Sequence, residues 1–219
     1  MGNVPQVVLF DLDGTISDSQ RGILAALRHA FAVHGLPPMD AEVERKVLGP
    51  PFYESLPPLI GGVPLEEVIA AYRGHYATTM FDTDLYAGVG ELIATLAAGG
   101  SRLALATSKP EAYAVKIVEH LGVAEHFEVL GGDALDGSRG TKALVIADVL
   151  RRLGDPHPSQ VIMIGDREHD VLGAREHGIE TIGVSWGYGP PGELEGVSPY
   201  AIAASACDVL AILRGTMAV

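Results

Sequence analysis

Two aspartates, Asp11 and Asp13, directly follow the short apolar run 7–10 near the start of the chain. The run is rich in Val and predicts a strand that is buried on both faces. Side chains at i and i+2 of a strand share one face and lie roughly 6–7 Å apart along it. Two carboxylates in this arrangement can bracket one reacting group, one attacking it and the other exchanging protons with it. The alternative is that both aspartates only turn or cap the chain, as Asp often does.

Two later apolar runs, 103–106 and 161–164, also end in polar side chains. These are Thr107 and Ser108 after the first run, and Asp166 and Asp170 after the second. Alone, Thr107 and Ser108 could cap the following helix, and Asp166 could be a helix N-cap. In a parallel sheet, however, the carboxyl ends of the strands share one edge. We therefore expect all these side chains to gather beside Asp11 and Asp13.

From residue 86 onward, apolar strand patterns alternate with helical patterns. Strands are expected over 103–106, 127–130, 161–164 and 181–184, and helices over 88–98, 112–121, 141–153, 171–177 and most of 202–213. This alternation predicts an α/β fold with a doubly wound, mostly parallel sheet of Rossmann-like type. Ligands of such sheets bind outside the carboxyl ends of the strands.

A helical segment interrupts this pattern directly after the first strand. Helices are expected over 19–34, 40–48, 52–60 and 64–78, with a rigid break at 49–51 and no convincing strand. We expect a catalytic core of residues 1–16 and 85–219 and an all-helical insert of residues 17–84. Because the insert follows the first strand, it is expected to lie over that strand's carboxyl end as a lid. Arg45, Lys46, Phe52 and Tyr53 could face a substrate there, or belong to a solvated face and the insert's own core.

The composition excludes several classes of protein. The net charge is −13, from 15 Lys and Arg against 28 Asp and Glu, and no basic cluster occurs, so a nucleic-acid polymer is not an expected partner. Apolar runs are much shorter than about 18 residues and no export signal opens the chain, so we expect no membrane span and a cytoplasmic protein. Cys207 is the only cysteine, which excludes an internal disulfide; its apolar surroundings predict a small buried residue.

The predicted cluster of acids suits a divalent cation and a phosphoryl group. Asp11, Asp13 and Asp166 offer the hard oxygen ligands that Mg²⁺ prefers, and Asp170 would support them one helical turn away. Lys142 opens a helix, where the macrodipole disfavours a cation. It could pair with these acids and neutralise transferred phosphoryl charge, or be a solvated lysine. Arg139 just upstream is interpreted as a loop arginine.

These segments together resemble the four motifs of the haloacid dehalogenase superfamily. The matching residues, in chain order, are Asp11-Leu12-Asp13-Gly14-Thr15, Thr107, Lys142, and Gly165-Asp166 with Asp170. The insert resembles the helical cap of that superfamily. The segments 106–110 and 165–170 are similar to its phosphoglycolate phosphatase and 5′-nucleotidase-like branch.

The resemblance implies a Mg²⁺-dependent hydrolase of small phosphorylated metabolites. Asp11 would attack phosphorus to form an aspartyl-phosphate, and Asp13 would protonate the leaving oxygen and then deprotonate water. Thr107, Ser108 and Lys142 would bind the phosphoryl group. Mg²⁺ would be bound by the Asp11 carboxylate, the Asp13 backbone carbonyl and Asp166. The second acid, Asp13, argues against dehalogenation, because displacing halide needs no proton donor.

Alternatives remain open at this point. The substrate could be a 5′-nucleotide or phosphoglycolate, with a slight preference for the nucleotide. A β-phosphoglucomutase-like phosphotransferase would share the same core motifs. A non-catalytic binding protein is disfavoured, because such a protein could lose an acid without penalty and here the acids and Lys142 are all present. The stretch 186–189 could approach the site or only pack as a loop.

Overall fold

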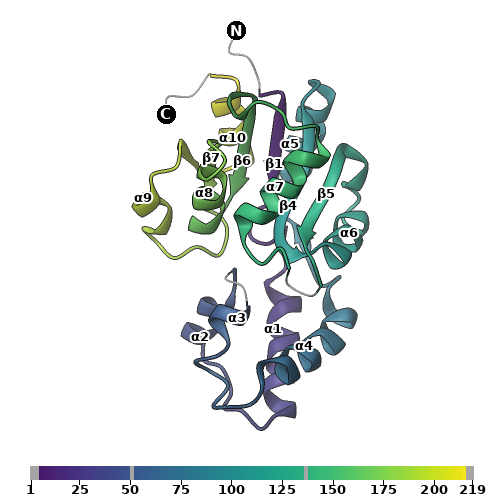
Figure 1. Cartoon of the computed structure of the whole chain (residues 1–219), viewed down its shortest axis with the longest axis vertical. Coiled ribbons are helices and arrows are strands. Elements are labelled where there is room, and N and C mark those ends of the chain that lie inside the picture. Colours follow the sequence, from purple (N-terminus) through teal and green to yellow (C-terminus); the bar gives the residue numbers. More distant parts are fainter. Residues whose placement is uncertain (1–4, 50–51, 136–137, 216–219) are drawn as a thin grey trace. The chain divides into compact units, whose positions relative to one another are not determined.

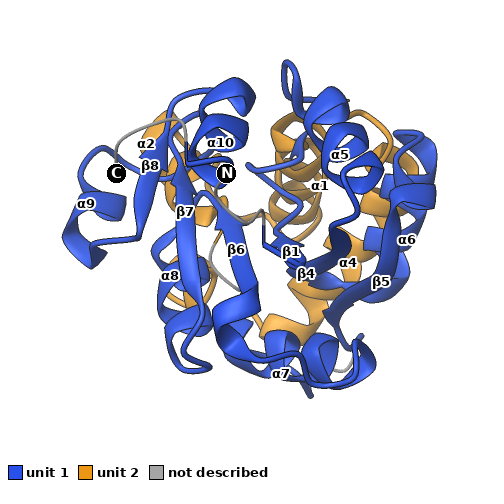
Figure 2. Cartoon of the chain, turned by 90° about the horizontal axis from the view of Figure 1, so that it is seen from above, with its two compact units in different colours: residues 1–17, 85–219 blue, residues 18–84 orange. Residues whose placement is uncertain are grey.

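The chain forms two compact units, residues 1–17 with 85–219 and residues 18–84 (Figure 2). The computed structural model describes residues 5–49, 52–135 and 138–215, so the expected break at 49–51 falls mostly outside the described residues. Each unit is described here by itself.

The larger unit is built on a parallel sheet. Among its described residues, six strands form one sheet in the order β5-β4-β1-β6-β7-β8 (Figure 1). They are β1 (Val7–Phe10), β4 (Arg102–Pro110), β5 (Phe127–Asp133), β6 (Val161–Gly165), β7 (Glu180–Val184) and β8 (Ala201–Ala203). From β1 the chain continues to β4 and β5 on one side and then crosses to β6, β7 and β8 on the other. The predicted doubly wound sheet is thus confirmed, and its switch point lies at β1, where such sheets bind ligands.

Helices cover both faces of this sheet. They are α5 (Val89–Ala98), α6 (Glu111–His120), α7 (Lys142–Arg152), α8 (Glu168–Arg175), α9 (Glu193–Val197) and α10 (Ala206–Leu213), with short 3₁₀ turns over Ala124–His126 and Pro158–Gln160. Figure 2 shows α7 and α8 on one face and α5 and α10 on the other. Leu9, Ala104 and Met163 share a buried core with Val145 and Val149 of α7. Because the side chains of a strand alternate, Asp11 continues on the same side as Leu9, toward α7.

The smaller unit is mainly helical. Its helices are α1 (Gln20–Val33), α2 (Ala41–Val47), α3 (Phe52–Ser55) and α4 (Leu65–Thr79). Helix α1 lies close to α4 at Gly22, where an added Cβ would collide with the carbonyl oxygen of Thr79. The Thr79 hydroxyl donates to the Gly22 carbonyl over 3.0 Å. Half-buried Phe52 packs edge-on against the buried Tyr72, with ring centroids 4.7 Å apart, so its ring contacts this unit's own core.

Short strands depart from the sequence-based expectation. The two-residue strands β2 (Ser17–Asp18) and β3 (Asp84–Leu85) pair with each other where no strand was expected. The expected helix over 52–60 is regular only over Phe52–Ser55. In the tail, Ala201–Ala203 adds the edge strand β8 instead of opening a helix. A strand of only three residues carries too little periodicity to be distinguished from a helix.

Cys207 is exposed, and the expectation that it is buried was wrong. Helix α10 buries Ala206, Val209 and Ile212 on one face. Cys207 follows Ala206 by about 100° around the helix, which turns it away from that face. Nowhere in the described ranges is a helix both long enough and apolar enough to cross a membrane.

Candidate active site

Lys142 joins two buried aspartates at the carboxyl edge of the sheet. Its Nζ atom lies 2.8 Å from Oδ1 of Asp11, which follows β1, and 2.8 Å from Oδ1 of Asp170 in α8. It also donates to the carbonyl of Ala106 over 3.0 Å. Burial alone would lower the pKa of Lys142, but the two carboxylates outweigh it and hold that pKa above the ordinary value of lysine. The lysine is therefore a cation.

The start of α7 places this lysine. Thr141 is the N-cap, and its hydroxyl accepts a hydrogen bond from the Leu144 amide over 3.2 Å. Gly173 of α8 lets the lysine stem pass, since a Cβ there would lie 2.9 Å from both Cβ and Cγ of Lys142. The cap and the glycine together direct the ammonium toward the strand ends.

Asp166 completes a cluster of three buried acids. Asp11, Asp166 and Asp170 each offer an oxygen within 4.8 Å of the others. Burial first, and then the like charges of Asp170 and Asp11, raise the pKa of Asp166 well above its ordinary value. Burial also raises the pKa of Asp170 to about 6, although Lys142 opposes this rise. Three carboxylates around one ammonium leave an excess of negative charge.

This donor set fits a divalent cation. Closely spaced carboxylate oxygens with an uncompensated negative charge are what a hard ion such as Mg²⁺ selects. A bound cation would also reverse the rise in pKa that the acids impose on one another. The cluster contains the Asp11 and Asp166 carboxylates that the sequence nominated, together with Asp170.

Asp13 points to a different partner. Its Oδ2 lies 2.9 Å from Nζ of Lys109, a buried lysine near the end of β4. The Lys109 amide donates to the Thr107 hydroxyl oxygen over 3.3 Å, so Thr107 keeps its own proton to donate elsewhere. Thr107 is buried and Ser108 beside it is half-buried. The two nominated carboxylates thus contact different lysines, Asp11 with Lys142 and Asp13 with Lys109.

The loop after β7 encloses Asp166. The Tyr188 amide donates to Oδ2 of Asp166 over 2.8 Å, and the Thr15 hydroxyl donates to Oδ1 over 3.3 Å. The Trp186 indole donates to the Thr15 carbonyl over 3.1 Å. An added Cβ at Gly187 would collide with Asp166, and so would one at Gly14. The stretch 186–189, left open between packing and approaching the site, does both.

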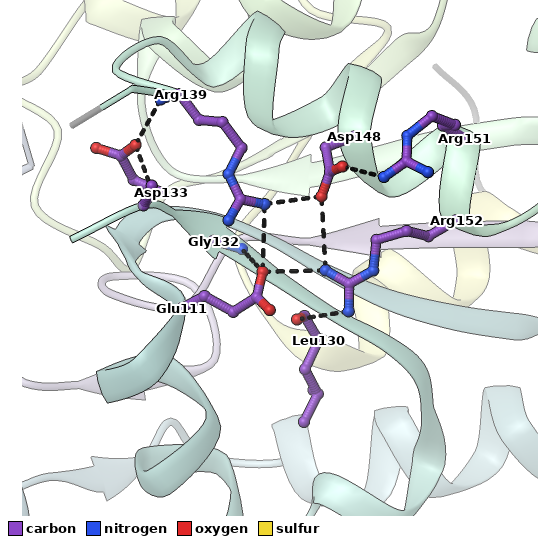
Figure 3. A network of polar contacts seen from close by, with 9 residues as sticks. Glu111, Leu130, Gly132, Asp133, Arg139, Asp148, Arg151 and Arg152 are labelled. Atoms are coloured by element: carbon purple, nitrogen blue, oxygen red, sulfur yellow. Dashed lines mark hydrogen bonds and ion pairs between the residues drawn. The ribbon is translucent and has the colours of Figure 1, made fainter. Parts of the chain in front are cut away.

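Three further side chains of the larger unit form ion pairs without having been nominated. Lys109 pairs with Asp13, and Arg167 forms a two-pronged pair with Glu193, of which the shorter contact is 2.7 Å. Arg139, expected as a loop arginine, lies in a loop but bridges Glu111 and Asp148 (Figure 3). Lys109 and Arg167 lie inside the segments 106–110 and 165–170 on which the resemblance rests, whereas Arg139 had no signal beyond its proximity to Lys142.

This architecture defines a class of α/β proteins. A doubly wound parallel sheet carries a helical insertion after its first strand and an aspartate and lysine cluster at its carboxyl edge. The chain belongs to the haloacid dehalogenase-like hydrolase family, which it matches over residues 8–184. The resemblance seen in the sequence is confirmed.

Known proteins of several names are similar to this chain. Tyrosine-protein kinase PtkA of Mycobacterium tuberculosis is 46% identical over 189 residues, which cover 86% of this chain and 65% of PtkA. The chain therefore matches slightly less than two thirds of that relative's length. A 5′-nucleotidase of Pseudomonas aeruginosa is 34% identical over 210 residues, covering 94% of this chain and 93% of that protein. The crystal structure of a predicted phosphatase from Clostridium acetobutylicum superposes with a TM-score of 0.90 at 32% identity, covering 97% of this chain and 100% of the other.

Proposed function

We propose that this protein is a Mg²⁺-dependent hydrolase of small phosphate monoesters that acts through an aspartyl-phosphate. One observation carries the proposal: the Asp11 carboxylate ends β1 within 2.8 Å of the Lys142 ammonium, inside a cluster of buried acids. A carboxylate so placed can attack phosphorus while a fixed cation neutralises the phosphoryl oxygens. The 5′-nucleotidase and the phosphatase that resemble the chain support this proposal.

In the first step, an Asp11 oxygen forms a bond to phosphorus in line with the ester bond. The ester P–O bond breaks, and its electron pair leaves with the ester oxygen. Asp13, as a carboxylic acid, gives its proton to that oxygen. Lys142 and the Thr107 hydroxyl hold the other phosphoryl oxygens. The product alcohol leaves and the phosphoryl group remains on Asp11.

In the second step, water attacks the phosphorus of the aspartyl-phosphate. Asp13, now a carboxylate, accepts a proton from that water as the new P–O bond forms. The bond between phosphorus and the Asp11 oxygen breaks, and its electron pair returns to the carboxylate. Inorganic phosphate leaves and both aspartates regain their starting states.

Mg²⁺ would be held by the Asp11 and Asp166 carboxylates, with Asp170 beside them. The resemblance to the superfamily adds the Asp13 backbone carbonyl to this set. When bound, the ion would withdraw electrons from the phosphoryl oxygens and offset the charge of the acids. Thr15 and Tyr188 fix the Asp166 carboxylate through hydrogen bonds. Such contacts orient a metal ligand and set its basicity.

The substrate is proposed to be a 5′-nucleotide or a phosphoglycolate-type ester, with residues 18–84 as the cap that selects it. The similarity to a 5′-nucleotidase over nearly the whole of both chains favours the nucleotide. Of the two aromatic residues considered for base stacking, Phe52 packs on Tyr72, whereas Tyr53 is exposed. Lys46 is exposed but paired with Glu42 over 2.7 Å. Tyr53 is therefore the better candidate for contact with a base.

Phosphoryl transfer to another acceptor is a second candidate function. It is favoured by the 46% identity to the proteins named tyrosine-protein kinase PtkA. A β-phosphoglucomutase-like transfer within one sugar belongs to the same class. Both would share the first step above and differ only in what takes the phosphoryl group from Asp11.

The test is phosphate release from p-nitrophenyl phosphate, AMP and 2-phosphoglycolate with Mg²⁺ or with EDTA. Asp11→Asn should lose the activity, whereas Asp82→Asn, the same change at an exposed turn of the other unit, should retain it. Equal turnover by Asp11→Asn would overturn the assignment of the nucleophile. Labelled phosphate that appears on a tyrosine peptide or a sugar phosphate, rather than as free phosphate, would favour transfer over hydrolysis.

A further inference from the structure

Lys109 is a buried cation that the reaction above does not use. Its Nζ atom lies 2.9 Å from Oδ2 of Asp13, and the residue is only 9% exposed. Removing an ammonium group from water is costly unless a carboxylate compensates it. The side chain of Lys109 is thus held against the residue that the proposed reaction uses as its proton carrier.

An irregularity in β4 delivers this lysine. From Ala104 to Thr107 the strand pairs residue by residue with β5, and Thr107 lies opposite Gly132. The next pair is Pro110 with Asp133. Between these two pairs β4 therefore contains two extra residues, Ser108 and Lys109, whereas Gly132 and Asp133 of β5 are consecutive. Bulges of this kind bend a strand and redirect its side chains, and they are common beside active sites.

Gly132 gives the bulge its space. A Cβ at this position would lie 2.5 Å from the carbonyl oxygen of Lys109 and 2.8 Å from Cα of Glu111. Both are backbone atoms, which cannot rotate away as a side chain can. The bulge in β4 and the glycine in β5 therefore determine the position of Lys109 together.

We propose that Lys109 is a positioning residue for Asp13. Its ammonium group holds the Asp13 carboxyl group in the orientation that exchanges a proton with the leaving oxygen and then with water. This inference rests on the proposed function, since it concerns the proton carrier of that reaction. The Lys109 amide also donates to Thr107, but this is a backbone contact that a change of side chain leaves in place.

The chemistry of the leaving group separates this role from a merely structural one. An alkoxide leaves phosphorus poorly without a proton, whereas p-nitrophenolate is a weak base and leaves readily. General acid catalysis typically contributes about 10²–10⁴-fold to a rate. A misplaced Asp13 should therefore slow an alkyl phosphate much more than p-nitrophenyl phosphate. Weaker phosphoryl binding or partial unfolding would slow both esters alike.

The experiment measures kcat/KM for p-nitrophenyl phosphate and for an alkyl ester, AMP or 2-phosphoglycolate, in Lys109→Met and Lys109→Arg. For Lys109→Met, we expect a loss with the alkyl ester that exceeds the loss with p-nitrophenyl phosphate by roughly tenfold or more. Lys109→Arg, which keeps the charge, should restore most of that difference. Lys116→Met, at an exposed position of α6, is the matched control and should match the wild type with both esters.

A double variant tests whether Lys109 acts through Asp13. Adding Lys109→Met to Asp13→Asn should not change the ratio of the two esters further, because the proton carrier is already gone. Equal losses with both esters in Lys109→Met, or a further change of the ratio in the double variant, would overturn the inference while the proposed function stands. Wild-type protein that hydrolyses neither ester would overturn the proposed function, and this inference with it.

Discussion

The Nζ atom of Lys142 lies 2.8 Å from Oδ1 of Asp170, so the first residue of α7 is tied to the first turn of α8. The other oxygen of Asp170 accepts a hydrogen bond from the Arg167 amide over 3.1 Å. Asp170 therefore anchors, at a buried position, the same ammonium group that contacts Asp11. Its contribution to activity should pass through the place it gives to Lys142.

Asp170→Asn should lower kcat/KM by about 10–100-fold, the usual effect of removing a residue that orients a catalytic group. Stability should not fall with it. The pKa of Asp170 is raised to about 6 in the folded protein, above its ordinary value, so the ionised side chain costs stability above that pH. A neutral side chain removes this cost. Urea unfolding in EDTA at pH 7.5, beside steady-state kinetics, measures both effects.

The opposite pattern would contradict this reading of Asp170. If Asp170→Asn unfolded at a much lower urea concentration and lost activity only in proportion to its unfolded fraction, the residue would be part of the scaffold alone. Val171→Ala is the control. It leaves a cavity at the buried residue next to Asp170 and should lower stability before it lowers activity.

Mg²⁺ should raise the thermal midpoint of the protein. An ion that binds only the folded state at about 100 times its Kd adds about 2.7 kcal/mol of stability. For a chain of this size that corresponds to several degrees, about 2–4 °C for each kcal/mol. Asp166→Asn should lose most of this shift, whereas Glu119→Gln, an exposed change on α6, should keep it. A midpoint unchanged by Mg²⁺ in the wild type would contradict the metal site.

Gly14→Ala and Gly62→Ala separate backbone strain from crowding of Asp166. Both glycines have positive φ angles, +85° and +91°, so alanine costs each a similar strain, of order 1 kcal/mol. Only at Gly14 would the new Cβ collide with the Asp166 carboxylate; Gly62 has no neighbour within 4 Å. We expect a lower thermal midpoint in both variants, with the larger loss in Gly14→Ala because the collision adds to the strain, and a loss of kcat of roughly tenfold or more in Gly14→Ala alone. Equal activity in the two variants would show that Asp166 tolerates displacement.

The sheet and the gathering of the acids could be predicted because both follow from local pattern. Apolar runs such as 103–106 and 161–164 alternate with helical segments, which favours parallel strands. Parallel strands end on one edge, so the residues that follow them must meet there. For this reason Asp11, Asp166 and Asp170 are found within one cluster.

What could not be predicted depends on contacts between distant segments. The direction of the Lys109 side chain depends on a bulge that exists only relative to β5. The donor that Tyr188 offers to Asp166 is a backbone amide, which carries no residue-type signal. The exposure of Cys207 depends on which face of α10 is buried. The helix was expected to begin at residue 202, but Ala201–Ala203 forms the strand β8 and α10 begins only at Ala206.

Asp148 of α7 lies among three arginines (Figure 3). Its carboxylate accepts hydrogen bonds from Arg151 over 2.6 Å and from Arg139 over 2.7 Å, and Arg152 lies 3.6 Å away. The Arg151 hydrogen bond is the largest cause that lowers the pKa of Asp148, and the positive charges of the arginines add to it against burial. A carboxylate with a pKa lowered on folding stabilises the protein above its ordinary pKa, and this contribution is lost as the pH falls through the folded-state pKa.

Asp148→Asn should therefore reduce the free energy of unfolding at pH 7 by about 1 kcal/mol. The difference from the wild type should begin to shrink as the pH falls below about 4, where this carboxylate is protonated in the unfolded protein, and it should disappear only below the lowered pKa of the folded protein. Urea unfolding at pH 7, 5 and 3.5 measures both. Asp82→Asn makes the same change in an exposed pair with Arg21, which solvent screens, and should cost less at every pH. A difference for Asp148→Asn that stayed constant down to pH 3.5 would show that its side chain acts through shape and neutral hydrogen bonds, with no contribution from its charge.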